Sequence, residues 1–181
     1  MVNLANSEYD GNYVFAGANT KLTPYEIDEN GFINYYGTLH DNPDYIRQTE
    51  ISEGVYEVIN TTGDKVFGYY MQETIILDTN GDIVTYDSDT AKYYYEDGTE
   101  YTGNESDLTT TTHINSEGLL GTMKRMSNAL QDIIDGNTTS GYQELNDTID
   151  KLSDVQNNIL NEQTKFGGVS NRLSMTDSTL E

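Results

Sequence analysis

Apolar residues recur at intervals of seven along the last third of the chain, residues 141–175. The main row consists of Leu145, Leu152, Ile159, Phe166 and Leu173. A second row, offset by three or four positions, consists of Tyr142 and Ile149 and then turns polar at Gln156, Gln163 and Ser170. This spacing places both rows on one narrow stripe of an α-helix, which Val155 and Val169 widen. The pattern predicts a long helix that packs against others through an assembly seam of Leu145, Ile149, Leu152, Ile159, Phe166 and Leu173.

A shorter helix is predicted before it, at residues 119–134, with a buried face of Leu119, Met123, Met126, Leu130 and Ile133. We expect Asn115 or Ser116 to cap its start and Gly136 to end it, while Ser140 and Gln143 form a capping box for the long helix. At 1.5 Å per residue the two helices span roughly 24 Å and 50 Å. The hairpin would therefore leave about half of the seam without a partner helix.

The length difference predicts which seam residues are covered. The shorter helix should cover Leu145 and Leu152, and the apolar residues left most exposed should be Ile159, Phe166 and Leu173. Gly167 and Gly168 interrupt the same stripe, where each glycine costs up to about 1 kcal/mol relative to alanine. They predict either a close approach of another backbone or a local break that ends the rigid helix.

The first 115 residues carry the signals of short strands and turns. Residues 2–8 indicate the tail of a helix that Asp10 and Gly11 stop, and 13–17 indicate a strand. Turn residues then separate pairs of expected strands, which predicts hairpins of 25–28 with 32–36, 55–59 with 66–70, 73–77 with 82–86, and 92–95 with 100–101. Residues 104–112 are polar and Thr-rich and are expected to be an exit linker.

These elements predict an α+β fold in which a helical hairpin or bundle with a long C-terminal helix carries an inserted antiparallel β domain, either a sandwich or a meander. Helical segments at 1–11 and 118–181 should form one discontinuous rod domain, and 12–117 the inserted domain. A helix of the length expected at the start is unstable alone, because a helix needs about 12 residues to be stable in water. We therefore expect a longer N-terminal helix, missing from this sequence, or a neighbouring subunit to complete the rod.

Composition removes several classes of function. The chain has 181 residues and a formal net charge of −22, so nucleic acid and anionic membranes would be repelled as partners. It has no Cys, which excludes disulfides, thiolate metal sites and Cys nucleophiles. No apolar run approaches the ~18 residues of a membrane span, and the start lacks the pattern of a conventional secretory signal.

Candidate chemistry is sparse. His40 and His113 lie far apart, neither an HExxH nor a GxSxG motif is present, and no carboxylate pair stands out, so we expect no catalytic residue, no cofactor and no metal site. Asp78, Asn80 and Asp82 alternate as in a calcium loop, with Asp89 at the twelfth position. That alternative fits poorly, because Ile83 stands where such a loop needs glycine.

Tyrosines crowd one part of the β region: Tyr69, Tyr70, Tyr86, Tyr93, Tyr94, Tyr95 and Tyr101. An aromatic platform of this kind could stack on sugars. Tyr also suits half-buried strands by its shape and its wet hydroxyl, and this explanation is the stronger one. Glycan binding stays open as an alternative.

Two stretches of the chain resemble a known family. The segment Leu4-Ala5-Asn6-Ser7 followed by Asp10-Gly11-Asn12-Tyr13-Val14-Phe15-Ala16-Gly17 resembles the helix exit and first strand of bacterial flagellar hook-associated protein 3, of the flagellin superfamily. Val169-Ser170-Asn171-Arg172-Leu173 resembles the family's closing segment. The resemblance covers about residues 4–67 and 118–175, and 68–117 looks like an insert without a counterpart. The signature residues are Asp10, Gly11, Tyr13, Phe15, Gly17, Asn171 and Arg172.

The resemblance implies a structural adaptor that joins the flagellar hook to the filament, without enzymatic activity. It implies export through the flagellum's type III pathway with an export chaperone, an extracellular location on the flagellum, and contacts with neighbouring copies and adjacent hook-associated proteins. The resemblance also predicts that the family's terminal coiled-coil segments lie outside this sequence. The alternatives are a filament flagellin, a secreted glycan-binding adhesin module and, with no site to support it, a hydrolase.

Overall fold

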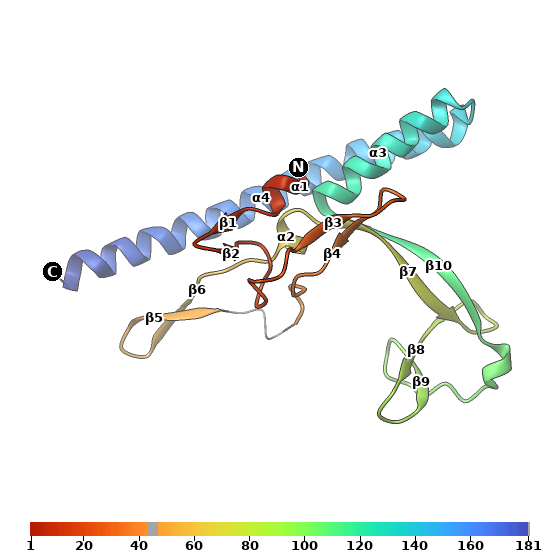
Figure 1. Ribbon diagram of the computed structural model, residues 1–181, viewed down its shortest axis with the longest axis horizontal. Coiled ribbons are helices and arrows are strands. Elements are labelled where there is room, and N and C mark those ends of the chain that lie inside the picture. The colour runs from red at the N-terminus through yellow and green to blue at the C-terminus, as the bar shows by residue number, and fades with distance from the viewer. Residues whose placement is uncertain (43–46, 181) are drawn as a thin grey trace. The chain divides into compact units, whose positions relative to one another are not determined.

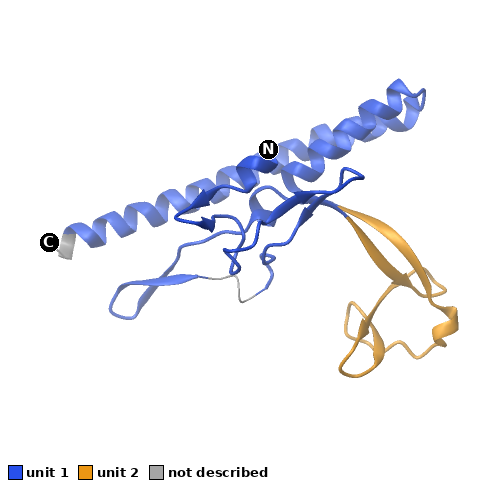
Figure 2. Cartoon of the chain, viewed as in Figure 1, with its two compact units in different colours: residues 1–71, 116–181 blue, residues 72–115 orange. Residues whose placement is uncertain are grey.

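The computed structural model describes residues 1–42 and 47–180 (Figure 1). The chain divides into two compact units (Figure 2). Unit 1 comprises Met1–Met71 and Ser116–Glu181, and unit 2 comprises Gln72–Asn115. The fold is α+β, with a long C-terminal helix and antiparallel strands, which confirms the predicted class. Unit 1 therefore combines the helices with the first part of the β region. The predicted division into a rod domain and an inserted domain at 12–117 stays a prediction.

Unit 1 contains four helices and several short strands among its described residues. In chain order they are α1 Val2–Ala5, β1 Glu8–Tyr9, β2 Asn12–Tyr13, β3 Tyr25–Ile27, β4 Ile33–Tyr35, β5 Gln48–Ser52, β6 Val55–Val58, α2 Gly63–Val66, the start of β7 Tyr69–Leu77, α3 Gly118–Ile134 and α4 Thr138–Leu180. The strands pair antiparallel as β1 with β2, β3 with β4, β4 with β7, and β5 with β6.

The predicted hairpin around Asn30-Gly31 is confirmed, since Tyr25 pairs with Tyr35 and Ile27 with Ile33. The predicted strand at 13–17 is wrong. Tyr13 belongs to β2, and Ala16 makes only a single bridge, to Thr62. The predicted hairpin of 55–59 with 66–70 is also wrong, because β6 pairs with β5 and the expected turn residues start helix α2.

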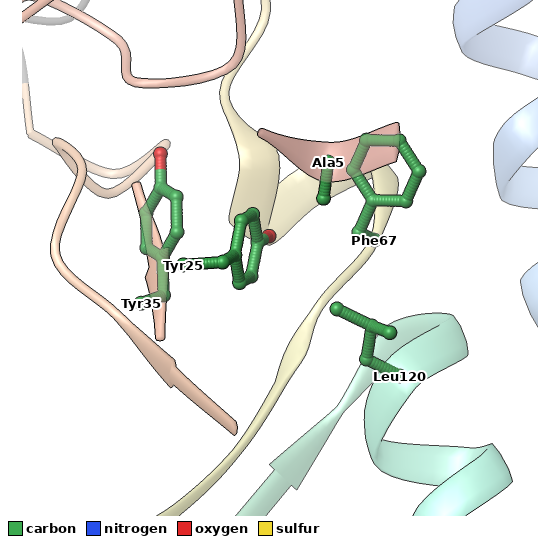
Figure 3. Packing of buried hydrophobic residues seen from close by; sticks show 5 residues of the cluster. All are labelled: Ala5, Tyr25, Tyr35, Phe67 and Leu120. Carbon is green, nitrogen blue, oxygen red and sulfur yellow. The ribbon is translucent and has the colours of Figure 1, made fainter. Parts of the chain in front are cut away.

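The core of unit 1 is small and aromatic (Figure 3). Its buried members are Ala5, Tyr25, Tyr35, Phe67 and Leu120, contributed by α1, β3, β4, the end of α2 and α3. The ring centroids of Tyr25 and Tyr35 lie 4.9 Å apart. Burial raises the pKa of the Tyr25 hydroxyl well above its usual range, and this hydroxyl donates to the Gly68 carbonyl at 3.0 Å. A buried phenol with its hydroxyl satisfied contributes its apolar ring without leaving a polar atom unpaired.

The ends of the helices differ from the expected caps. Glu117, instead of Asn115 or Ser116, occupies the N-cap position of α3, and no side chain caps it. Helix α4 begins at Thr138, so Ser140 lies inside it and its hydroxyl donates to the Asn137 carbonyl at 3.1 Å instead of forming a capping box. Gly136 has a φ of +96°, in the left-handed region, and follows α3 as expected. Among the described residues, no helix combines the length and apolar composition that a membrane crossing requires.

Helix α4 is continuous over 43 residues, which corresponds to about 65 Å at 1.5 Å per residue. It passes through Gly167 and Gly168 without interruption, so the expected local break is wrong. No side chain or backbone of the described chain comes within 4 Å of a Cβ built on Gly167. A Cβ on Gly168 would lie 3.6 Å from Arg172 Nη1, so no other backbone of the described chain approaches the glycine pair closely.

Unit 2 is built from antiparallel strands: most of β7, β8 Ile83–Asp87, β9 Lys92–Tyr95 and β10 Thr109–Glu117, with the short helix η2 Glu105–Asp107. The hairpin around Asn80-Gly81 is confirmed, because Ile76 pairs with Val84 and Leu77 with Ile83. Strand β9 pairs with β8, and Tyr94 forms a bridge to Glu100 as the next hairpin predicts. The predicted linker at 104–112 is wrong in part, since 109–112 belong to β10, which pairs with β7.

Candidate assembly surface on the long helix

Helix α4 buries one face within unit 1. Four of its residues are buried: Gly141, and Thr148, Glu162 and Val169 with exposed fractions of 0%, 7% and 4%. The half-buried residues on the same face are Leu145, Leu152, Val155, Ile159 and Phe166. The covered stripe thus has the predicted main row, but its second row is Thr148, Val155, Glu162 and Val169. The expected second row is wrong for the isolated chain, because Tyr142 is 56% and Ile149 53% exposed.

The first half of this face packs against α3. A Cβ on Gly141 would lie 2.6 Å from the Ile133 side chain and 2.8 Å from the Ala129 carbonyl, so only glycine allows this approach. The Arg125 guanidinium pairs with the Glu144 carboxylate at 2.5 Å across the hairpin. The two antiparallel helices are held by small residues at the contact and an ion pair beside it.

The second half of the face packs against β segments of unit 1. Lys65, from α2, pairs with Glu162 at 2.9 Å, and the Thr61 hydroxyl donates to the same carboxylate at 3.2 Å. The Asn158 amide donates to the Lys65 carbonyl at 2.7 Å. We call these four residues, Thr61, Lys65, Asn158 and Glu162, the Glu162 latch. They fix the segment that leads into α2 against one level of α4.

The latch keeps Glu162 ionised. Burial acts to raise the pKa of Glu162, but the Lys65 hydrogen bond, the charges of Lys165 and Lys65, and the Thr61 hydroxyl outweigh it. The pKa of this carboxyl therefore lies below its usual range. A buried charge of this kind stabilises the folded state only while its partners are in place.

A second contact joins α4 to β6. The Arg172 guanidinium donates from Nε to Glu57 Oε2 at 3.1 Å and from Nη2 to Glu57 Oε1. Glu57 is a half-buried residue of β6. A bidentate pair of this kind fixes the orientation of both the guanidinium and the carboxylate. Of the two closing signature residues, Arg172 thus makes a contact within the fold, whereas Asn171 is exposed.

These contacts overturn the expected exposure of the seam. Ile159 and Phe166 are half-buried and Leu173 is 37% exposed. The more exposed apolar residues of α4 are Met175 at 69%, Tyr142 at 56%, Ile149 at 53% and Leu160 at 49%. The physical reason is that the short helix α2, the segment leading into it and strands such as β5 cover α4 beyond the reach of α3.

An exposed apolar row remains beside the covered face. Tyr142, Ile149 and Leu160 are separated by seven and eleven residues, so they lie within about 20° of one another around the helix at 100° per residue. Leu160 also lines an apolar groove with Leu119, Leu152, Val155, Gln156 and Ile159. This row, defined as Tyr142, Ile149 and Leu160, is the candidate assembly surface.

The N-terminal signature residues have structural roles in unit 1. Asp10 and Gly11 have φ values of +49° and +66° and form the two-residue turn between β1 and β2. The rings of Phe15 and Phe67 meet edge to face with centroids 4.9 Å apart. Gly17 has a φ of +70°, and a Cβ there would lie 2.8 Å from the Thr38 Cβ. The Tyr13 hydroxyl accepts a hydrogen bond from Thr23 at 3.0 Å.

Asn6 holds the edge of β3. Its side-chain amide donates to the Tyr25 carbonyl at 2.9 Å, and its carbonyl oxygen accepts the Tyr25 N–H at 2.9 Å. The amide thus takes the place of a neighbouring strand at this edge. An ionised carboxylate could not replace it, because a carboxylate accepts hydrogen bonds and has no donor.

Replacing Asn6 with aspartate should destabilise unit 1 by about 1–2 kcal/mol, because the carboxylate loses the donor and faces the Tyr25 carbonyl. Asn3→Asp makes the same charge change on an exposed residue of α1 and is the control. Urea unfolding of both variants at neutral pH measures the difference. Equal stability of the two variants would show that the hydrogen bonds of the Asn6 side chain to Tyr25 do not stabilise the edge of β3.

The calcium alternative finds no support in the geometry of unit 2. Asp78 Oδ1 accepts the Asn80 and Asp82 N–H groups at 2.8 and 2.9 Å, and Oδ2 accepts the Tyr95 hydroxyl at 3.0 Å. The hydrogen bond from Asp82, followed by those from Asn80 and Tyr95, lowers the pKa of Asp78 although burial acts the other way. Over residues 1–42 and 47–180, no group of three or more His, Cys, Asp or Glu is placed to hold a metal ion.

The crowded tyrosines do not form one platform. Tyr70 is buried in unit 1, where it stacks on Phe32 at 5.6 Å and accepts a hydrogen bond from Asn128. In unit 2 the aromatic contacts are pairwise, Tyr86 with Tyr93 at 5.0 Å and Tyr95 with Tyr101 at 6.0 Å. His40 is equally structural, since its Nδ1 lies 2.7 Å from the buried Asp64 carboxylate.

Two solved structures match the chain over nearly its whole length. The crystal structure of flagellar hook-associated protein 3 from Legionella pneumophila matches with a TM-score of 0.59 and 15% sequence identity, over 98% of this chain and 72% of that one. This chain has that fold. The flagellar junction protein FlgL from Legionella pneumophila matches with a TM-score of 0.54 and 13% identity, over the same shares of both chains.

Comparisons of the amino-acid sequence found no relatives of this chain. No family model matches the chain, and no curated protein matches it. The resemblance inferred from the sequence over about residues 4–67 and 118–175 is therefore confirmed at the level of the fold, by structures that match almost the whole of this chain.

Proposed function

We propose that this chain is a structural subunit of the bacterial flagellum, a non-enzymatic adaptor that joins the hook to the filament. The observation that carries the proposal is the fold match over 98% of the chain to a flagellar hook-associated protein and a flagellar junction protein. A continuous helix of 43 residues suits a subunit that transmits torque along an axis.

The proposed assembly works through two faces of α4. Its covered face binds α3 and the Glu162 latch, so the β segments move with the helix. The exposed row of Tyr142, Ile149 and Leu160 is free to pack against helices of neighbouring copies or of adjacent hook-associated proteins. The predicted seam residue Ile149 thus keeps its role in assembly, while Leu145, Leu152, Ile159 and Phe166 serve mainly within the chain.

Location and export follow from the same proposal. The adaptor is extracellular, on the flagellum, and is exported unfolded through the flagellar type III pathway with an export chaperone. The absence of Cys suits a chain that must pass unfolded and refold outside without disulfide chemistry. Neither nucleic acid nor membrane is a partner.

A double substitution on the exposed row tests the proposal. Deleting the gene in its own bacterium should leave hooks without filaments, and the unmodified gene should restore filaments and swimming. Ile149→Lys combined with Leu160→Lys should fail to restore them, because two charges would be buried at the helix contact. The isolated variant should keep its melting temperature within about 2 °C, since surface substitutions usually change stability by less than 0.5 kcal/mol.

Gln143→Lys combined with Asn161→Lys is the matched control, because both residues are exposed and Asn161 lies about 120° around α4 from Ile149. This variant should restore filaments. Filaments of normal length in the deletion strain would contradict the adaptor role. Restoration by the Ile149→Lys and Leu160→Lys variant would contradict the role of the exposed row in assembly, but it would leave the adaptor role of the chain intact.

A further inference from the structure

Unit 1 contains a pocket between the β1–β2 hairpin, the residues that flank the β5–β6 hairpin, and α4. Its volume of about 660 Å³ falls within the range of ~300–1,000 Å³ that is usual for sites that bind small molecules. The β1–β2 hairpin contributes Tyr9 and Tyr13, and α4 contributes Phe166. Arg47 precedes β5 and Ile59 follows β6 at the pocket's other wall. We call this site the Arg47 pocket.

The walls of the Arg47 pocket are mainly apolar and aromatic. Tyr9 is 81% and Ile59 42% exposed, and the rings of Tyr13 and Phe166 are half-buried. Aromatic rings attract one another in stacked or edge-to-face arrangements, beyond the gain from burying their apolar area. A planar aromatic molecule in the pocket would therefore cover apolar surface that water contacts in the free chain.

The uncharged polar side chains of the pocket are engaged within the fold. The Asn12 side chain donates to the Asp10 carbonyl at 2.9 Å and accepts the Thr20 hydroxyl at 2.9 Å. The Thr61 hydroxyl belongs to the Glu162 latch. These side chains fix the shape of the pocket, so the recognition of a charged ligand depends on its ionised residues.

Arg47 is held at the rim of the pocket with its guanidinium unpaired. Its backbone N–H donates to the Asn60 side chain at 2.7 Å, and its carbonyl accepts the Ile59 N–H at 2.9 Å. Among the described residues its guanidinium forms no ion pair, whereas the other two arginines, Arg125 and Arg172, each pair with a glutamate. In a chain with 31 acidic residues, this guanidinium is thus available to the carboxylate of a ligand.

Asp10 limits which anions fit the pocket. It lines the same pocket as Arg47, and in the described part of the chain no ion pair joins the two residues. The Asp10 carboxylate and the net charge of −22 would repel a ligand that carries a second negative charge. The pocket is therefore complementary to a molecule with one carboxylate and an uncharged aromatic body.

We propose that the Arg47 pocket binds a small aromatic monocarboxylate. The ligand's ring lies against Tyr9, Ile59 and Phe166, and its carboxylate pairs with the Arg47 guanidinium. Because the pocket joins the β1–β2 hairpin to α4, the bound ligand stabilises the folded form of unit 1. The inference does not depend on the flagellar role, and it uses a surface separate from the exposed row of α4.

Isothermal titration calorimetry of the whole chain with 2-naphthoate tests the proposal. We expect a dissociation constant of about 1 mM or lower, an ordinary affinity for a ligand of this size. The neutral 2-naphthamide should bind about fivefold more weakly, because it cannot form the charged pair. The dianion 2,6-naphthalenedicarboxylate should also bind more weakly, because Asp10 repels its second carboxylate. No binding of 2-naphthoate, or equal affinity for either analogue, would overturn the proposal.

Arg47→Gln separates the charged pair from the shape of the pocket. This variant should raise the dissociation constant for 2-naphthoate about tenfold, the loss of a hydrogen bond to a charged group, and leave that for 2-naphthamide unchanged. Lys124→Gln is the matched control, because it removes one positive charge from a different apolar groove of unit 1, which Met1 and Met123 also line. Its affinity for 2-naphthoate should stay within about twofold of the unmodified chain's.

The contrary results are distinct. Equal weakening of 2-naphthoate by both variants would show that overall charge sets the affinity and would refute the pocket. Equal weakening of both ligands by Arg47→Gln would contradict the charged pair. NMR signals of Tyr9, Ile59 and Phe166 should shift when 2-naphthoate binds, and shifts confined to other residues would place the ligand elsewhere and refute the proposal.

Discussion

Replacing Gly68 with alanine should destabilise unit 1 by more than about 4 kcal/mol, beyond the range of most single substitutions. A Cβ on Gly68 would lie 1.9 Å from the Glu117 carbonyl oxygen, and the backbone there has a φ of +69°. Gly118 faces it at φ +60°, so the two segments cross backbone to backbone. The Leu120 N–H donates to the Phe67 carbonyl at 2.7 Å beside this crossing, which ties α3 to the core.

Gly54→Ala is the control that measures the cost of the left-handed backbone conformation by itself, without a steric clash of the added Cβ. Gly54 has nearly the same φ, +73°, but no atom lies within 4 Å of its built Cβ. We expect this variant to lose about 1–2 kcal/mol, the cost of an L-residue in that conformation. Urea denaturation followed by circular dichroism measures both. If Gly68→Ala lost no more than Gly54→Ala, the close crossing of the two segments would be refuted.

Replacing Glu162 with glutamine should cost about 2 kcal/mol at neutral pH, because Lys65 loses its charge partner while remaining partly buried. The loss should shrink in acid. The pKa of Glu162 is lower in the folded chain than its unfolded value, so its stabilisation is complete above about pH 4.3 and disappears as pH falls through the lowered value. The difference between wild type and Glu162→Gln should therefore close below that pH.

Glu100→Gln is the matched control, since Glu100 pairs with Lys92 at 2.8 Å but both side chains are about half exposed. Exposed pairs contribute little, and we expect no measurable change in unfolding. Denaturant unfolding from pH 2.5 to 7 compares the variants. A Glu162→Gln difference that stays constant with pH would show that the latch does not depend on the ionised carboxylate.

Elements with strong local signals were predictable from the sequence. The seven-residue repeat is long enough to define α4 even with two glycines in it. The β3–β4 and β7–β8 hairpins follow from Asn-Gly turns, in which Gly31 and Gly81 adopt φ values of +80° and +89° that glycine tolerates best. In these places the local preference and the final fold agree.

Elements fixed by distant contacts were not predictable. Thr61-Thr62-Gly63-Asp64 has the composition of a hairpin turn, but the Gly63 N–H donates to the Phe15 carbonyl at 2.9 Å and the segment starts α2. Nothing within the segment encodes that partner. The wrong second row of the seam has the same origin, because Tyr142 and Ile149 are more apolar than Thr148 and Glu162, which α4 buries instead.

The polar members of the covered row are satisfied by specific partners. The Thr148 hydroxyl donates to the Leu145 carbonyl at 2.8 Å, and Glu162 binds Lys65 from a segment almost a hundred residues away in sequence. One signal was available, since Glu162 stands seven residues after Val155 and seven before Val169. A charged residue at a seam position indicates either a buried ion pair or a residue that fixes the register in which helices pack.

The position of the chain on the flagellum tests the central proposal most directly. Antibodies against unit 2, coupled to gold and viewed by electron microscopy on intact flagella, should label one site at the boundary between hook and filament. Label along the entire filament would identify a flagellin instead. Label on the cell surface with none on flagella would contradict a flagellar role and favour an adhesin.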